Sequence, residues 1–349
     1  MVGSPATRAT FSTATQFMHG PYRVKMQRRA SHDISINSWS FCWYFSYSYR
    51  SSIGTSEPRF RMRARWLCRH LTSPPSSMTF EPALVLPLAL LGLGTGFLAG
   101  LLGIGGGMLM VPFITFILSH RGVSPDLSVK MAIATSMATI LFTSLSSVRA
   151  HHQRGAVRWP LVKRLAPGII LGGMIASLGV FSLLKGAWLA LFFAAFVSFS
   201  ATQMLLDKKP APTRQLPGTP GLMGTGGVIG FLSGLVGAGG GFVSVPFMTW
   251  CNVPIHNAIA TSAALGFPIA LANVVGYALS GQTVANLPPY SFGFIWLPAL
   301  GVIATCSVFT APLGAKAAHV LPVKQLKRVF ATILFGLAAY MLYKGLTSR

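Results

Sequence analysis

Apolar runs separated by short polar or basic segments fill the chain from residue 83 onward. Most of these runs approach or exceed the length of about 20 residues that an α-helix needs to cross a bilayer. The pattern therefore predicts an all-α integral membrane protein with eight to ten transmembrane spans. The runs lie near residues 83–103, 107–119, 129–149, 161–183, 186–206, 217–237, 241–252, 257–280, 292–313 and 326–345.

The second half of this region repeats the first. Residues 96–115 (GFLAGLLGIGGGMLMVPFIT) return at 230–249 as GFLSGLVGAGGGFVSVPFMT, with thirteen of twenty positions identical. The sequence AIATS follows each copy, at 132–136 and again at 258–262. Such duplication is typical of membrane transporters that are built from two structural repeats.

We place the first repeat at 78–206 and the second at 217–349, joined by a basic cytoplasmic linker at 207–216. Five spans per repeat is an odd number, so the second repeat is expected to be inverted relative to the first. Basic residues cluster between particular spans, and short basic loops of membrane proteins lie on the cytoplasmic side. We therefore expect a multi-pass protein of the cell (inner) membrane, with 281–291, which carries no charge, on the opposite side. The basic clusters are Arg149, Arg154, Arg158, Lys163 and Arg164, then Lys208, Lys209 and Arg214, and finally Lys316, Lys324, Lys327 and Arg328.

Residues 1–77 lie outside the repeated unit. They are rich in Ser and Arg and contain no apolar stretch long enough to span a bilayer. Met78 stands directly before the first apolar span, so we favour a translation start at Met78. A disordered tail and an organelle transit peptide are the alternatives.

The spans at 107–119 and 241–252 are too short to cross about 30 Å of hydrocarbon as single helices. Each begins at a triple glycine and carries a Val-Pro pair, and such broken helices at matching places in two halves indicate a transporter's binding site. A helix that starts at glycine presents unpaired N–H groups and a positive dipole end, which together favour an anion. The predicted substrate-binding glycines are Gly105, Gly106, Gly107, Gly239, Gly240 and Gly241.

Hydroxyl side chains are the next candidates. The duplicated AIATS supplies Thr135, Ser136, Thr261 and Ser262, each able to donate to an oxyanion or to bond its own helix backbone. Asn273 is a further candidate. The glycine pairs Gly96/Gly100 and Gly230/Gly234 are instead predicted to pack helices closely.

The segment HHQRGAVRW (151–159) offers His152 and Arg154 as gate contacts for an anion, although a basic loop that fixes topology explains it better.

Composition and missing motifs argue against several classes of function. The chain is 52% hydrophobic and 9% charged, and its net charge of +23 gathers in short loops, so binding to nucleic acid is not expected. Neither a metal-ligand spacing nor a nucleophile–base set nor a phosphate-binding loop occurs, which predicts no enzyme, no metal and no cofactor. Carboxylates are absent from nearly all spans, whereas proton- and cation-coupled carriers usually need one. The expected partners are the lipid bilayer and a small anionic substrate; homo-oligomerisation is left open.

Four sequence motifs occur together between residues 83 and 345: the duplicated GxxxGxxGxGGGxxxVP, the following ATS, HHQRGAVRW and APLGAKAAHVLP. In this combination the chain resembles the TauE/SafE family of membrane proteins. The resemblance implies export of small sulfur-containing oxyanions such as sulfite and sulfoacetate-like sulfonates, through a midplane site between two rocking repeats. A permease for another small organic anion and a non-transporting membrane subunit remain the alternatives.

Overall fold

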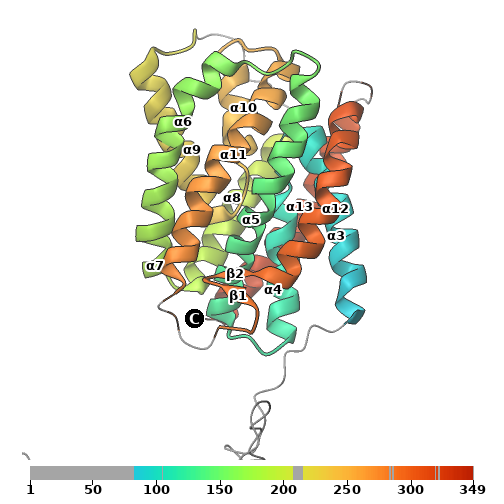
Figure 1. Cartoon of the computed structure of the whole chain (residues 1–349), viewed down its shortest axis with the longest axis vertical. Helices are drawn as coiled ribbons and strands as arrows, with labels where there is room; N and C mark the ends of the chain where they lie inside the picture. Colours follow the sequence, from blue (N-terminus) through green and yellow to red (C-terminus); the bar gives the residue numbers. More distant parts are fainter. Residues whose placement is uncertain are drawn as a thin grey trace, which may run out of the picture. The chain divides into compact units, whose positions relative to one another are not determined.

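The computed structural model describes residues 82–348 apart from 104, 207–214, 283, 285–286, 319 and 321–322. This part of the chain is a helical bundle with one short hairpin (Figure 1). Residues 1–77 and the predicted start at Met78 lie outside the described residues, as does most of the predicted linker at 207–216.

The elements are η1 (Pro82–Leu84), α3 (Val85–Leu102), α4 (Gly107–His120), α5 (Pro125–His152), α6 (Trp159–Met174), the π-helix η2 (Ile175–Val180), α7 (Phe181–Leu183), α8 (Gly186–Leu206), α9 (Thr219–Val236), α10 (Gly241–Trp250), α11 (Ile255–Ser280), β1 (Ser291–Phe292), β2 (Ile295–Trp296), α12 (Leu297–Ala317) and α13 (Val323–Thr347).

Among the described residues, eight helices are long and apolar enough to cross a membrane, counting α6, η2 and α7 as one continuous helix. This confirms the predicted all-α membrane class. Helices α4 and α10 have 14 and 10 residues. At a rise of 1.5 Å per residue they are about 21 Å and 15 Å long, so neither reaches across about 30 Å of hydrocarbon alone.

Helices α5 and α11 form the centre of the bundle. In their most apolar windows 72% of the residues are buried, against 33–44% in the other candidate spans. They pack against each other, and the remaining long helices surround them in crossed pairs. Helix α3 packs on α12, α9 on α6, and α8 on α13. Because each of these pairs joins an element of the first repeat to one of the second, the repeats interlock instead of forming separate bodies.

Glycine makes the crossed packing close. A Cβ atom on Gly96 of α3 would collide with the backbone of Ser307 on α12, and one on Gly230 of α9 would collide with the backbone of Ile169 on α6. The prediction that these glycines pack helices is therefore confirmed. All four glycines assigned to packing lie at close helix contacts, three against backbone and Gly234 against the side chains of Asn273 and Ala176: Gly96, Gly100, Gly230 and Gly234.

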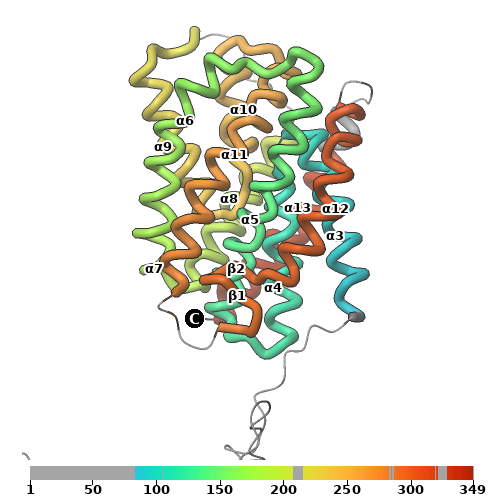
Figure 2. Tube along the Cα trace, in the orientation of Figure 1, coloured from blue at the N-terminus to red at the C-terminus, as the bar shows by residue number. Residues whose placement is uncertain are grey.

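Corresponding helices of the two repeats run in opposite directions. In Figures 1 and 2, α3 rises from the end that carries the β1–β2 hairpin, whereas α9 descends from the other end; α12 and α6 differ in the same way. The α5–α6 junction and the C-terminal end of α12 lie at one end of the bundle, and the hairpin lies at the other. This arrangement supports inverted repeats, while the inversion across a membrane and the cytoplasmic side of the basic junctions stay predictions.

One predicted boundary is wrong. The apolar run near 292–313 was expected to be helical from its start, but α12 begins only at Leu297. The preceding residues form the hairpin, in which Tyr290 and Gly293 have positive φ angles of 62° and 56°. Hydrophobicity alone does not distinguish such a buried hairpin from the first turn of a membrane helix.

Candidate functional site

Both short helices begin at glycines with left-handed backbone conformations. Gly106 precedes α4 with φ 70°, Gly240 precedes α10 with φ 75°, and neither helix has a side-chain hydrogen bond at its N-cap. The first N–H groups of a helix have no partner within the helix, and this end carries a partial positive charge. Helices α4 and α10 therefore each present uncapped amide donors at the start predicted from the sequence.

The two triple glycines meet inside the bundle. A Cβ atom on Gly105 would lie 3.0 Å from the Cα atom of Gly239, and one on Gly107 would collide with the carbonyl of Gly237. Only glycine allows the two loops to approach this closely. The structure thus brings Gly105–Gly107 and Gly239–Gly241 together, and their contact with a substrate stays a prediction.

The duplicated serines bond across from one repeat to the other. Ser136 Oγ donates to the Gly237 carbonyl at 2.8 Å, and Ser262 Oγ donates to the Gly103 carbonyl at 2.9 Å. Gly103 and Gly237 are the left-handed C-caps of α3 and α9. Each serine hydrogen therefore satisfies a carbonyl where a helix of the other repeat ends.

The duplicated threonines make a second crossed pair of bonds. The backbone N–H of Trp296 donates to Thr135 Oγ1 at 3.0 Å, and the N–H of Arg158 donates to Thr261 Oγ1 at 3.1 Å. Trp296 and Arg158 are the N-caps of α12 and α6. The ATS motif thus holds the ends of helices in the opposite repeat, a role that sequence reasoning missed. Its contact with an anion stays a prediction.

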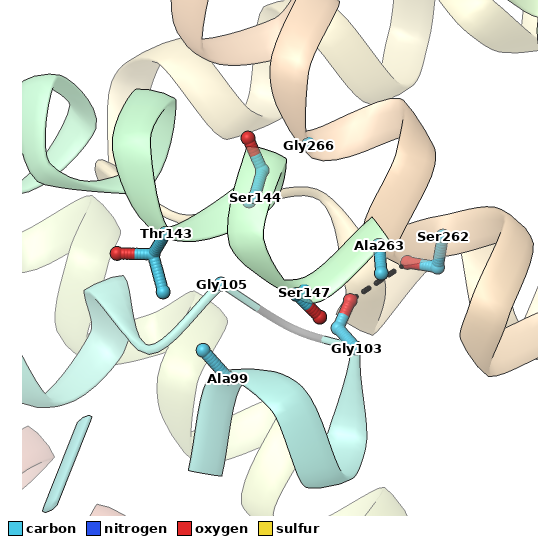
Figure 3. Close-up of a pocket in the computed structure, with 10 residues that line it drawn as sticks. Ala99, Gly103, Gly105, Thr143, Ser144, Ser147, Ser262, Ala263 and Gly266 are labelled. Atoms are coloured by element: carbon cyan, nitrogen blue, oxygen red, sulfur yellow. Dashed lines mark hydrogen bonds between the residues drawn. The ribbon is translucent and has the colours of Figure 1, made fainter. Parts of the chain in front are cut away.

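A small cavity lies beside the meeting point of the glycine loops (Figure 3). Its volume is about 10 Å³. That is room for about one water, so a sulfur oxyanion would enter only if the walls moved apart. The described lining residues include no Lys, Arg or His; they are Ala99, Gly103, Gly105, Thr143, Ser144, Ser147, Gly239, Ser262, Ala263 and Gly266.

Ser147 is one of the cavity residues that sequence reasoning missed. Its side chain is 2% exposed, and Oγ has no hydrogen-bond partner among the described residues. Figure 3 shows Ser147 on α5 among the residues that line the cavity. The signal available in the sequence was its position, since Ser147 stands 126 residues before Asn273, the spacing of the AIATS copies.

Asn273 lies away from this cavity. Its Nδ2 donates to the Ile269 carbonyl at 2.8 Å, while Oδ1 is buried with no partner in the part of the chain that the structure describes. It packs beside Gly173 and Gly234, at the contact of α11 with α6 and α9. The structure therefore does not bring Asn273 together with the glycine loops, and its contact with a substrate stays a prediction.

The two predicted gate residues belong to a packed junction between α5 and α6. Trp159 Nε1 donates to His152 Nδ1 at 3.1 Å, and Arg154 Nη1 donates to the Ala315 carbonyl at 3.2 Å. Ala315 lies in the last turn of α12, where a cation is stabilised by the helix dipole. Neither side chain lines the cavity, and a gating role for them stays a prediction.

Asp126 is the acidic residue within the described ranges. Its Oδ1 accepts a hydrogen bond from the Gly186 N–H at the start of α8, and Oδ2 lies 3.7 Å from Lys130 Nζ. The carboxylate is therefore engaged in holding a helix start. Within the described residues no three His, Cys, Asp or Glu side chains come together.

Nearly the whole bundle matches a known family of proteins. Residues 88–341 match the family described as "Sulfite exporter TauE/SafE". A probable membrane transporter protein of Haemophilus influenzae is 39% identical over 263 residues, covering 74% of this chain and 98% of that protein. Probable membrane transporter proteins of Methanocaldococcus jannaschii and Bacillus subtilis are 28% and 27% identical, covering 76% and 75% of this chain and 98% of each relative. No solved structure matches the chain. By its sequence match and its eight apolar helices, the chain belongs to the TauE/SafE family of membrane transporters.

Proposed function

We propose that the protein exports small sulfur-containing oxyanions, sulfite and sulfonates, and binds them where α4 and α10 begin. The observation that supports this is the contact of Gly105 with Gly239, just before the two uncapped helix starts and beside a small cavity. Unpaired amides at a helix start bind oxyanions without a charged side chain. The description of the family supplies sulfite as the first substrate to test.

The proposed site binds through dipoles. The described residues that line the cavity are glycine, alanine, serine and threonine, and no Lys or Arg among them would hold an anion tightly. A transport site must bind strongly enough to admit its substrate and weakly enough to release it. Backbone amides and hydroxyls meet both conditions for a small oxyanion.

The membrane potential is the proposed driving force. An inside-negative potential favours outward movement of each negative charge by about 2.3 kcal/mol per 100 mV. In the described ranges the carboxylate of Asp126 is engaged with the start of α8 and with Lys130. An anion exporter driven by potential needs no coupling carboxylate.

The mechanism requires that the cavity open. In this conformation it admits about one water molecule, so the bound state forms only when the two interlocked repeats shift against each other. We propose that this rocking exposes the glycine loops first to one side of the membrane and then to the other. Basic residues at the α5–α6 junction would concentrate anions on the cytoplasmic side.

Flux measurement in proteoliposomes tests the proposal. The full chain is reconstituted, a potassium-diffusion potential is the only driving force, and efflux of radiolabelled sulfite is followed with and without methanesulfonate. We expect flux that depends on potential and is competed by methanesulfonate. Folded protein that moves neither sulfite nor sulfonates would overturn the substrate class in favour of another small organic anion. Flux only under a proton gradient would overturn the driving force.

A further inference from the structure

A row of hydroxyls runs along one face of α5. Thr135, Thr139, Thr143 and Ser147 are spaced four residues apart, which places them one above another on the helix. All four side chains are at most 2% exposed. At the equivalent positions α11 carries Thr261, Leu265, Ile269 and Asn273, so the middle of its row is apolar.

The neighbouring helices repeat this contrast. Gly96 of α3 packs on Ser307, whereas the equivalent Gly230 of α9 packs on Ile169. Ser307 Oγ lies 2.9 Å from Thr143 Oγ1, so a hydrogen bond links α12 to the hydroxyl row. We call α3, α5 and α12 the α5 half, and α9, α11 and α6 the α11 half. On α5 the buried Thr139 and Thr143 thus stand where α11 carries the buried Leu265 and Ile269.

The cavity lies between α5 and α11, and hydroxyls of the row on α5 form one of its walls. Thr143, Ser144 and Ser147 form its α5 wall, and Gly266 of α11 leaves the space opposite them. At the equivalent position α5 carries Ile140, 126 residues earlier. The glycine on α11 therefore leaves space that an isoleucine at this position would fill.

Burial of these hydroxyls needs an explanation. Thr139 and Thr143 donate to carbonyls four residues earlier, so their hydrogens have partners in this conformation. Ser147 Oγ has none among the described residues, although it is buried and lines the cavity. A buried hydroxyl without a partner is unfavourable unless something binds it in another state of the protein.

We propose that the substrate crosses the protein along one side only, on the hydroxyl face of α5 between α3 and α12, and that Ser147 Oγ donates a hydrogen bond to it in the cavity. This inference rests on the proposed function for its cargo, a small oxyanion. The α11 half supplies the matching frame but no route, because the buried side chains of Leu265 and Ile269 stand at the positions equivalent to Thr139 and Thr143.

Thiol labelling tests the route without any flux measurement. Ser147→Cys and Asn273→Cys are made separately in the full chain, with Cys42, Cys68, Cys251 and Cys306 replaced by serine. Membrane vesicles are treated with 2-sulfonatoethyl methanethiosulfonate, a thiol reagent that itself carries a sulfonate. We expect labelling at position 147, slowed by methanesulfonate, and at least tenfold slower labelling at position 273. Equal labelling at both positions, or faster labelling at 273, would overturn the one-sided route.

Flux through Ser147 variants tests the contact. Ser147→Ala should lower the rate of sulfite efflux about tenfold, as expected for one hydrogen bond to a charged group, and Ser147→Thr should restore most of it. Ser146→Ala is the matched control, because Ser146 Oγ donates to the Val308 carbonyl at 2.7 Å and does not line the cavity. Thermal unfolding of each variant shows that the protein remains folded.

The outcomes separate the two proposals. If the unmodified chain transports sulfite and Ser147→Ala does so at the same rate, the contact is wrong and the proposed function stands. If the unmodified chain transports no oxyanion, the proposed function fails. The labelling comparison of positions 147 and 273 then still decides whether an anion reaches one side only.

Discussion

The α5 half and the α11 half share a frame and differ in what faces the interior. Ser136 and Ser262 bond to glycine carbonyls in opposite repeats, and Thr135 and Thr261 accept from the N-caps of α12 and α6. Every one of these bonds has its counterpart in the other repeat. The interior side chains between them do not, since threonine and serine on one side oppose isoleucine and leucine on the other.

This difference shows which contacts a duplicated membrane fold requires on both sides. The frame bonds involve backbone groups at helix ends, and unsatisfied backbone groups are costly in hydrocarbon, so each repeat needs its own set. An interior side chain between helices carries no such obligation. The interior face of α5 can therefore carry hydroxyls beside the cavity, while the middle of the equivalent face of α11 is apolar. Four predictions test this separation of frame and lining.

The largest effect is expected from breaking the frame. Gly96→Leu and Gly230→Leu each place a side chain against the backbone of a partner helix, Ser307 or Ile169. We expect each change to destabilise the protein by at least about 3 kcal/mol, because the backbone contact leaves no room for relaxation. The yield of monodisperse protein in detergent and its thermal midpoint measure this. Gly301→Leu is the control, since a Cβ atom there meets nothing within 4 Å. Normal folding of either variant would contradict a shared frame.

Filling the cavity should remove transport while the fold persists. Gly266→Ile gives α11 the residue that α5 carries at the equivalent position, Ile140. A Cβ atom at Gly266 comes 3.1 Å from Ser144 Cβ, so the neighbour must shift slightly, at a cost of about 1–3 kcal/mol. Sulfite efflux should fall by about a hundredfold or more, an effect of at least about 2.7 kcal/mol on the transport barrier. The control is Gly301→Ile, and efflux of Gly266→Ile at the unmodified rate would place the route elsewhere.

The frame serines should separate stability from transport. Ser136→Ala and Ser262→Ala each leave a buried glycine carbonyl without its donor, so both should lower stability by a similar amount, about 1–3 kcal/mol. Ser262 also lines the cavity, whereas Ser136 does not. Efflux per folded molecule should therefore fall further for Ser262→Ala. Thermal midpoints and efflux rates, normalised to folded protein, check this. Equal efflux from both variants would contradict a role in transport for Ser262 as a cavity residue.

The smallest effect concerns the bond that joins α12 to the hydroxyl row. Thr143→Val and Ser307→Ala each break the bond of 2.9 Å between their side chains. In a double-mutant cycle we expect a coupling energy of about 0.6 kcal/mol, the average for interhelical hydrogen bonds in a membrane protein. Thermal midpoints of the two single variants and the double variant give this value. Strict additivity of the two changes would mean that this hydrogen bond contributes no coupling energy between α5 and α12.

Sequence reasoning reached the helices and the position of the glycine loops. The starts of α4 and α10 at Gly107 and Gly241 agree with the predicted short spans because glycine marks the chain break locally. The hairpin before α12 was missed, since its residues are as apolar as a membrane helix. Ser147 was missed because nothing in its local sequence distinguishes it from Ser146. Its missing partner becomes visible only when the surrounding helices are in place.

The sequence by itself determined the class of protein, its duplication and its two broken helices. Length, hydrophobicity and glycine position act within a few residues, so they can be read along the chain. Only the tertiary structure decided that the repeats interlock, that the ATS motif bonds across them, and that the cavity lies between α5 and α11. Those features join residues far apart, such as Ser136 with Gly237 at a separation of 101 and Ser262 with Gly103 at 159. A cavity is the space that such distant side chains leave unfilled, and no single segment of the chain determines it.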